Sequence, residues 1–207
     1  MIILGLTGSI AMGKTTAARH FQRAGIWVYD SDLAVHGLLS KGGEAVDIIS
    51  KDFPEVIKNR SVDRGLLGEL VFNNKMAIRK LEAILHPLVR KQQIKFLSKA
   101  TRNRQKFAVL DVPLLFETGG DKNCDFTACV SAPTFLQYMR AMRRPKMTRS
   151  KLRGIIEFQI PNEIKCQKAD FIIRSGLSIK SSLYDVKTII AFLKMKTSKS
   201  WKVGWGR

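Results

Sequence analysis

The sequence has few cysteines, few acidic residues and no long hydrophobic run. Its 207 residues include three cysteines, and none of them forms a C-x-x-C pair, which argues against a disulfide framework and a zinc site. No stretch approaches the roughly 20 apolar residues that a membrane-spanning helix needs. The apolar run from Met1 to Leu6 is too short for the core of a signal peptide. We therefore expect reduced thiols and a cytoplasmic protein without membrane attachment.

The shortage of acidic residues gives the chain a strong positive charge. Lysine and arginine number 36 against 17 aspartates and glutamates, so the formal net charge is +19. Such a surplus favours anionic partners, which include nucleotides, phosphorylated small molecules and nucleic acids. Composition alone does not choose among these three classes. The length fits one sizeable domain with its own core, spanning residues 1–207.

The most specific motif is Gly8-Ser9-Ile10-Ala11-Met12-Gly13-Lys14-Thr15, which fits the phosphate-loop pattern G-x-x-x-x-G-K-[ST]. It follows an apolar run typical of a strand and precedes a helical pattern, as the motif requires. Its glycines let the backbone N–H groups turn inward to cradle phosphates. We predict that Lys14 bridges the outer phosphates and that Thr15 offers its hydroxyl to Mg²⁺. The predicted nucleotide-binding residues are Gly8, Ala11, Met12, Gly13, Lys14, Thr15 and Thr16.

Two aspartates follow the next predicted strand. The run from Ile26 to Tyr29 leads into Asp30 and Asp32, and a helix is predicted over Leu33 to Leu39. In an open α/β sheet, ligands bind outside the carboxyl ends of the strands, so these acids face the same crevice as the phosphate loop. We expect one aspartate to cap the helix and the other to take part in the chemistry.

A helical block separates this strand from the next one. One helix opens at Val62-Asp63-Arg64 and runs through Phe72, a second covers about 75–85, and a third begins at Pro87. Proline suits a first helical position because its missing N–H costs nothing there. The block, about residues 60–104, is therefore predicted to form an acceptor-side subdomain.

A further buried strand, Lys106 to Val112, carries Asp111 at its end. An acid in this position resembles the second nucleotide-site carboxylate, which orients Mg²⁺ or its waters. The alternative interpretation is an acid that only closes a strand-end turn. Further strands are predicted at Phe126–Val130 and Ala169–Ile173, with a closing helix over Ile179–Met195.

Basic residues gather in one segment of the second half. Seven lie between Arg140 and Arg153, and no acidic residue occurs between Phe126 and Ile156. Such a run can simply be a solvated face. Because a phosphate loop is present, we favour a mobile arginine-rich lid at about 140–158 that closes over phosphates.

Several blocks, in this order, resemble the dephospho-CoA kinase family. They are Leu6 to Thr16, Tyr29 to Asp32, Leu85 to Leu88, Val112 to Glu117, and Gln159 with Ala169-Asp170. The resemblance implies an enzyme that uses ATP and Mg²⁺ to phosphorylate the 3′-hydroxyl of dephospho-CoA, the last step of coenzyme A synthesis. It also implies a three-layer α/β fold with a parallel-sheet phosphate-loop kinase core, a helical CoA-side subdomain and a lid.

Carried over by position, the resemblance implies roles for five residues. Asp32 would be the base at the acceptor hydroxyl, and Arg64 an acceptor-side contact. Arg140 and Arg144 would be lid arginines. His86 matches a His-Pro turn in the family, and it either contacts the acceptor or packs as a structural residue.

The chain also departs from the family pattern. Ala11 and Met12 stand where glycine and serine are common, Pro145 follows the lid arginine where an acid is usual, and Arg174 stands where asparagine is frequent after the last strand. These departures concern the adenine and lid contacts and leave the implied reaction unchanged.

Two rival functions fit parts of the sequence. Another small-molecule kinase would share the loop and lid but differ across residues 60–104. A basic nucleic-acid-binding protein would explain the charge and Trp201 and Trp205 in the basic tail, but it leaves Asp32 and the phosphate loop without a purpose. A GTPase is disfavoured because no N-K-x-D motif occurs. We thus expect ATP and dephospho-CoA as partners and no specific nucleic acid. The sequence does not define the oligomeric state.

Overall fold

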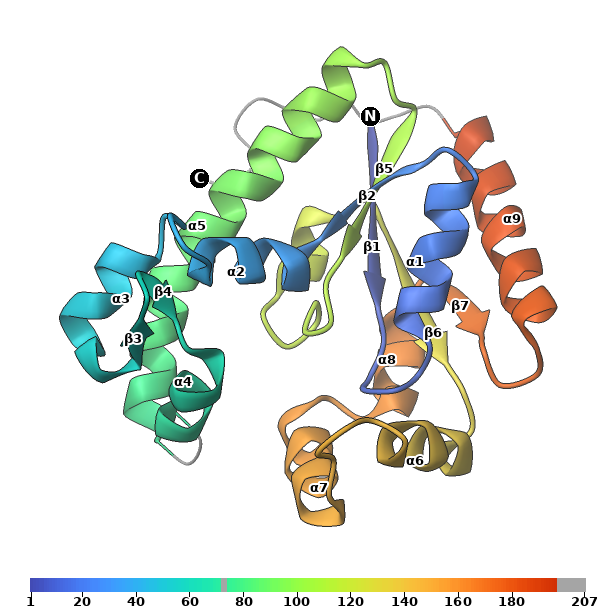
Figure 1. Cartoon of the computed structure of the whole chain (residues 1–207). Helices are drawn as coiled ribbons and strands as arrows, with labels where there is room; N and C mark the ends of the chain where they lie inside the picture. The colour runs from blue at the N-terminus through green and yellow to red at the C-terminus, as the bar shows by residue number, and fades with distance from the viewer. Residues whose placement is uncertain (72–73, 197–207) are drawn as a thin grey trace. The chain divides into compact units, whose positions relative to one another are not determined.

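The computed structural model describes residues 1–71 and 74–196 (Figure 1). The basic tail, with Trp201 and Trp205, lies outside the described residues. The chain divides into two compact units. The first comprises Met1–Tyr29 and Lys99–Arg207, and the second Asp30–Ser98.

The core of the first unit is a parallel sheet. Its strands are β1 (Ile2–Thr7), β2 (Trp27–Asp30), β5 (Phe107–Asp111), β6 (Phe126–Ser131) and β7 (Phe171–Arg174), in the order β2-β5-β1-β6-β7. β1 pairs in parallel with β5 and β6, and β6 with β7. Leu6 lies opposite both Asp111 and Ala128, so the carboxyl ends of the three central strands meet at one edge. The predicted parallel α/β sheet is therefore confirmed.

Helices cover both faces of this sheet, and two more lie beyond the carboxyl ends of its strands (Figure 1). Those on the faces are α1 (Lys14–Arg23), α8 (Asn162–Lys168) and α9 (Ile179–Met195); those beyond the strand ends are α6 (Thr134–Met142) and α7 (Arg149–Phe158), and a 3-10 turn spans Gly120–Asn123. On one face, α1 and α9 pack against each other and bury Phe21 and Ile189 with Val130 of β6 (Figure 1). The preceding strand residue, Cys129, points to the opposite face and contacts Cys166 of α8. Three layers result, and no described helix is long and apolar enough to cross a membrane.

The second unit has a core of its own. Its elements are α2 (Ser31–Leu39), α3 (Val46–Asp52), a 3-10 turn (Pro54–Val56), the hairpin β3 (Ile57–Lys58) and β4 (Ser61–Val62), α4 (Arg64–Val71) and α5 (Lys75–Arg102), which continues into the first unit. Leu38, Ile49 and Leu67 share one buried cluster. The unit begins at Asp30 rather than near residue 60 because α2 and α3 bury their apolar residues in that same cluster.

The prediction of a helix start at Pro87 is wrong. Pro87 lies inside α5, which runs unbroken over 28 residues. A proline inside a helix removes one backbone hydrogen bond, which normally favours a break. Here Leu85 and Leu88 on either side pack against the core of the second unit, and this burial holds the helix together.

The hairpin of β3 and β4 was not predicted at all. Its turn residues, Asn59 and Arg60, have φ angles of 49° and 59°. Two consecutive left-handed residues are typical of the tight hairpin turn that usually carries Asn-Gly. Arginine in the second position removes that sequence signal.

Burial of His20 on α1 predicts a loss of stability in acid. The side chain is 4% exposed, and its Nε2 has no hydrogen-bond partner among the described residues. Burial, and then the nearby Arg23, lowers the pKa of His20 below its ordinary value of 6.5. The unfolded chain therefore takes up the proton first, so stability is full above about pH 6.5 and falls below it.

We expect the free energy of unfolding, measured with denaturant, to decrease between about pH 7 and about pH 5. His20→Leu should flatten this dependence, whereas the exposed His86→Gln should not. An unchanged pH dependence in His20→Leu would show that other groups cause the acid sensitivity.

Candidate active site

The phosphate loop connects β1 to α1, and its two glycines are required by close contacts. Gly13 has a φ of 93° and precedes the first residue of α1. A Cβ atom at Gly13 would lie 2.9 Å from Ser175 Oγ, and one at Gly8 would lie 2.9 Å from the carbonyl oxygen of Val130. No larger residue fits at either position without moving backbone or neighbours.

The N-terminus of α1 is suited to an anion. Its first turn contains no acidic residue, and the helix dipole places partial positive charge at the loop. Thr15 is exposed and Thr16 is partly buried in this first turn. The Thr15 hydroxyl therefore belongs to the same first turn that the helix dipole makes suitable for an anion.

Lys14 and Asp111 are in contact. Lys14 Nζ lies 2.5 Å from Asp111 Oδ1, and the two side chains are 14% and 4% exposed. The parallel pairing of β1 with β5 favours this contact, because it places Asp111, the last residue of β5, beside the end of β1 from which the phosphate loop leads to Lys14. A cation and a carboxylate thus stand together at the carboxyl edge of the sheet.

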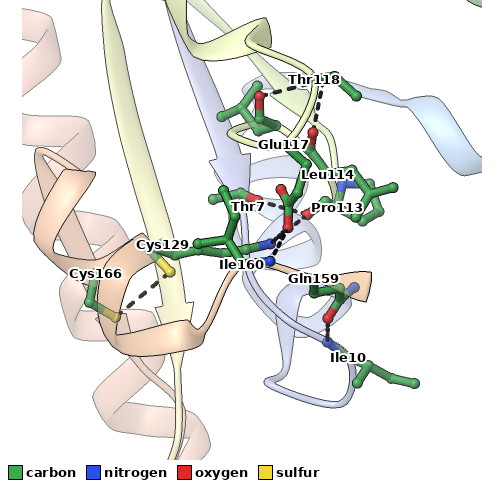
Figure 2. Close-up of polar contacts among 12 residues, drawn as sticks. Thr7, Ile10, Pro113, Leu114, Glu117, Thr118, Cys129, Gln159, Ile160 and Cys166 are labelled. Carbon is green, nitrogen blue, oxygen red and sulfur yellow. Dashed lines mark hydrogen bonds and ion pairs between the residues drawn. The ribbon is translucent and has the colours of Figure 1, made fainter. Parts of the chain in front are cut away.

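Two glutamines hold the phosphate loop at Ile10. Gln137 of α6 donates to the carbonyl oxygen of Ile10 at 3.0 Å. Gln159, which follows the last residue of α7, accepts from the N–H of Ile10 at 3.0 Å, as Figure 2 shows. Ala11 packs in a small buried cluster with Ala141 and Leu152 from the same two helices. Two residues of the segment predicted as a lid at about 140–158, Ala141 and Leu152, therefore contact the loop directly in this structure.

Arg140 lies beside the phosphate loop. Its guanidinium donates to Ser175 Oγ at 3.1 Å and to the Ser175 carbonyl oxygen at 2.7 Å. Ser175 Oγ in turn donates to the carbonyl oxygen of Met12 at 2.6 Å. A Cβ atom at Gly13 would be 3.7 Å from Arg140 Nη1, so this cation borders the cradle.

The other basic residues of this segment are exposed, and none of them pairs with a carboxylate in the described part of the chain. They are Arg143, Arg144, Lys146, Arg149, Lys151 and Arg153. Their charges are free to meet anions from solution. Arg144 lies in the turn between α6 and α7.

A family model described as dephospho-CoA kinase matches residues 2–180 of the chain. The dephospho-CoA kinase of Paramagnetospirillum magneticum is 46% identical over 194 residues, which are 94% of this chain and 92% of that protein. The chain belongs to the dephospho-CoA kinase family. The resemblance seen in the sequence is thereby confirmed.

Solved structures agree with this family assignment. TT1252 from Thermus thermophilus superposes with a TM-score of 0.80 at 30% identity, over 95% of this chain and 98% of that one. The dephospho-CoA kinase from Campylobacter jejuni gives a TM-score of 0.63 at 26% identity, over 92% and 96%. The chain is thus a kinase, and its co-substrate is ATP.

Three of the four departures from the dephospho-CoA kinase pattern, Ala11, Met12 and Arg174, have a defined local environment. Ala11 has a φ of 60°, the left-handed conformation that glycine adopts more easily. Met12 is buried, and its sulfur accepts from the N–H of Ala132 at 3.3 Å. Arg174 forms an ion pair with Asp185 of α9, at 2.6 Å between Nη2 and Oδ1, and this hydrogen bonding lowers the pKa of Asp185. Arg174 therefore joins β7 to α9.

The oxygen donors at the sheet edge suit Mg²⁺. The Thr15 hydroxyl and the Asp111 carboxylate are ligands that a hard cation prefers. No group of three or more His, Cys, Asp or Glu residues that could hold a metal is found in the described residues. Mg²⁺ usually takes one or two protein oxygens and completes its shell with phosphates and water, so this sparse donor set fits.

The two aspartates at the start of the second unit, Asp30 and Asp32, differ in their contacts. Asp30 caps α2, because its carboxylate accepts from the N–H of Leu33 at 2.9 Å. Asp32 is exposed in the first turn of the same helix. The prediction that one of the two aspartates caps the helix is therefore confirmed. The cap is Asp30, and Asp32 does not serve as the cap.

Arg64 opens α4 and lines a cavity of about 250 Å³ in the second unit. The lining residues are His36, Leu39, Ser40, Lys41, Ser61, Val62 and Arg64. Asp63 caps this helix, and its hydrogen bond from the N–H of Leu66 lowers the pKa of its carboxyl group. The basic side chains of Lys41 and Arg64 and the hydroxyl groups of Ser40 and Ser61 thus line one cavity.

His86, the remaining predicted acceptor-side residue, is exposed on α5 and is not among the residues that line this cavity.

The first unit brings together the phosphate loop, Asp111 and Arg140, whereas Asp32, Arg64 and His86 belong to the second unit. Sequence reasoning missed Gln137 and Ser175, which contact the loop backbone. In the sequence, the signal for Gln137 is a polar residue within the apolar run Phe135 to Met139, and the structure shows that it is buried.

Proposed function

We propose that this kinase transfers the γ-phosphoryl group of ATP to the 3′-hydroxyl of dephospho-CoA, giving coenzyme A and ADP. The contact of Lys14 with Asp111 beside the phosphate loop is the observation that supports this best. Phosphoryl transfer needs positioning and charge neutralisation rather than covalent catalysis by the protein. A cradle of backbone N–H groups with lysine and arginine at its border supplies both.

On the donor side, the loop N–H groups and Lys14 bind the β- and γ-phosphates, so Lys14 exchanges Asp111 for phosphate oxygens. Thr15 and Asp111 would hold Mg²⁺, which neutralises charge on the phosphates when bound. Arg140 and Arg144 neutralise the equatorial oxygens of the transferred group. Gly8, Ala11, Met12, Gly13 and Thr16 complete the nucleotide contacts through the loop and the first turn of α1.

On the acceptor side, Asp32 orients the 3′-hydroxyl and accepts its proton late in the reaction. Arg64 contacts the pyrophosphate of dephospho-CoA, and its cavity, which also contains Lys41 and His36, supports this role. His86 remains a proposed acceptor contact through the family pattern alone. The helical unit serves as the CoA side, and the segment at about 140–158 as the lid.

The proposed location is the cytoplasm. Cys129 and Cys166 are free thiols with their sulfur atoms 3.8 Å apart, which suits a reducing compartment. Burial raises the pKa of Cys124 to about 12, so that this thiol stays protonated and unreactive. The positive charge is assigned to phosphate-rich reactants and solvated surface, with no specific nucleic acid as partner.

Asp32→Asn is expected to lower kcat by about 10²-fold, because it keeps the shape of the side chain but removes the proton acceptor. The KM for ATP should change far less. Steady-state kinetics with dephospho-CoA as the varied substrate measure both.

Asp30→Asn is the matched control, since asparagine also caps helices well and the cap of α2 should persist. It should retain most of the activity. If Asp30→Asn lost activity while Asp32→Asn kept it, the base would be the other aspartate of the pair.

A substrate panel tests the proposed function. ADP release is measured with ATP and, in turn, dephospho-CoA, adenosine and AMP at equal concentrations. We expect rapid release with dephospho-CoA alone. Faster turnover of adenosine or AMP would assign the site to another class of small-molecule kinase.

A further inference from the structure

A buried ion pair lies next to the phosphate site and has no part in the mechanism above. Lys165 of α8 is fully buried, and its Nζ lies 2.7 Å from Glu117 Oε1. The same amino group donates to the carbonyl oxygen of Pro113 at 3.1 Å. Lys165 thus joins two points of the segment that follows Asp111.

The partners of this pair also contact the start of the phosphate loop. The carbonyl oxygen of Pro113 accepts a second hydrogen bond, from Thr7 Oγ1 at 3.0 Å (Figure 2). Thr7 is the last residue of β1 and precedes Gly8. Two hydrogen bonds that share the Pro113 carbonyl oxygen therefore connect Lys165 to the strand end that carries the loop.

The other partner, Glu117, contacts the end of the lid segment. Glu117 Oε1 accepts from the N–H of Ile160 at 2.9 Å (Figure 2). The preceding residue, Gln159, accepts from the N–H of Ile10 inside the loop at 3.0 Å. One carboxylate oxygen thus binds both the lysine and the backbone at the lid end.

The energetics of the pair favour a positional role over a purely stabilising one. Burying two charges costs solvation free energy, and apolar residues of similar size are often equally stable in such places. Glu117 Oε2 is buried and has no hydrogen-bond partner among the described residues, so the carboxylate is only half satisfied. What the pair provides, and an apolar pair cannot, is a set of directed bonds to Pro113 and Ile160.

We propose that Glu117 and Lys165 are positioning residues for phosphoryl transfer, which hold the end of the lid segment and the start of the phosphate loop in one fixed arrangement. The proposal rests on the proposed function for its kinetic consequences. If the arrangement loosens, the loop and the lid cations no longer meet the phosphates together, and kcat falls. Binding of dephospho-CoA, assigned to other residues, should change little.

Two variants distinguish a positioning role of the Glu117–Lys165 pair from a purely stabilising one. In Glu117→Gln an acceptor for the N–H of Ile160 remains, but Lys165 loses its counter-charge, so we expect a lower melting temperature and a kcat within about threefold of wild type. In the double variant Glu117→Met with Lys165→Met, no buried charge remains but the directed bonds are lost. We expect a melting temperature near wild type and a kcat lower by about 10-fold to 100-fold, with the KM for dephospho-CoA unchanged.

If kcat decreased only in the variant whose melting temperature decreases, the proposal would be overturned, and the pair would have a purely structural role. A double variant with wild-type kcat would also overturn it. If the double variant does not fold, Glu117→Met alone is compared with Glu117→Gln, because only the former removes the acceptor for Ile160.

Amide hydrogen exchange gives a readout that needs no substrate. In the variants with Glu117→Met, which lack the acceptor for Ile160, amide exchange at both Ile160 and Ile10 should be faster by about 10-fold or more. The amide of Leu4 in β1 should exchange at the wild-type rate in these variants. In Glu117→Gln, exchange at Ile160 and Ile10 should also be unchanged. Acceleration at Ile160 without Ile10 would contradict the coupling. Because exchange is measured on the protein alone, this result is distinguishable from a failure to phosphorylate dephospho-CoA.

Discussion

Lys14→Ala is expected to lower kcat by about 10³-fold or more. Lys14 is the cation in contact with Asp111 at the base of the loop, and in the proposed mechanism it carries the point charge at the β- and γ-phosphates. The arginines of the lid segment come from other elements and cannot take its place at the first residue of α1. Steady-state turnover at saturating ATP measures the loss.

Lys168→Ala removes the same charge from an exposed site on α8 and serves as the control. It should keep wild-type turnover. Thermal unfolding of both variants confirms that the fold persists. Near wild-type kcat in a folded Lys14→Ala would mean that the phosphate loop is not the active centre.

Arg140→Ala is expected to lower kcat by roughly 10³-fold, the effect associated with arginines that stabilise the transition state. Its guanidinium borders Gly13 and is held in place by two hydrogen bonds to Ser175. The variant removes a cation from the edge of the phosphate cradle. It should act on kcat more than on the KM for ATP, as steady-state kinetics will test.

Two controls separate charge from anchoring. Arg102→Ala deletes an exposed arginine at the end of α5 and should be silent. Ser175→Ala removes one anchor of Arg140 and the bond to Met12 but keeps the cation, so its effect should be much smaller. If Arg140→Ala behaved like Arg102→Ala, Arg140 would be a surface charge only.

The sequence predicted what depends on local patterns. The strand of β1, the loop and α1 were predictable because an apolar run, two glycines and a helical repeat follow one another within 24 residues. The carboxyl-edge position of Asp111 followed from its place at the end of an apolar run. Parallel pairing then brought it to Lys14, as expected for an open α/β sheet.

The contacts that the sequence did not predict join distant segments. Lys165 and Glu117 lie 48 positions apart, and no local pattern pairs them, although the fold leaves their side chains only 0% and 14% exposed. Pro87 was misread because its local signal is a helix start, whereas burial of its neighbours decides the outcome. At Pro87, packing therefore overrides the local helix propensity.

The position of the new phosphate tests the central claim most directly. Dephospho-CoA is incubated with ATP, Mg²⁺ and the enzyme, and the purified product is analysed by phosphorus–proton correlation NMR. The account predicts a phosphate coupled to the 3′ proton of the ribose, in one equivalent per ADP formed. A phosphate at any other position, or unmodified dephospho-CoA despite ATP turnover, would contradict it.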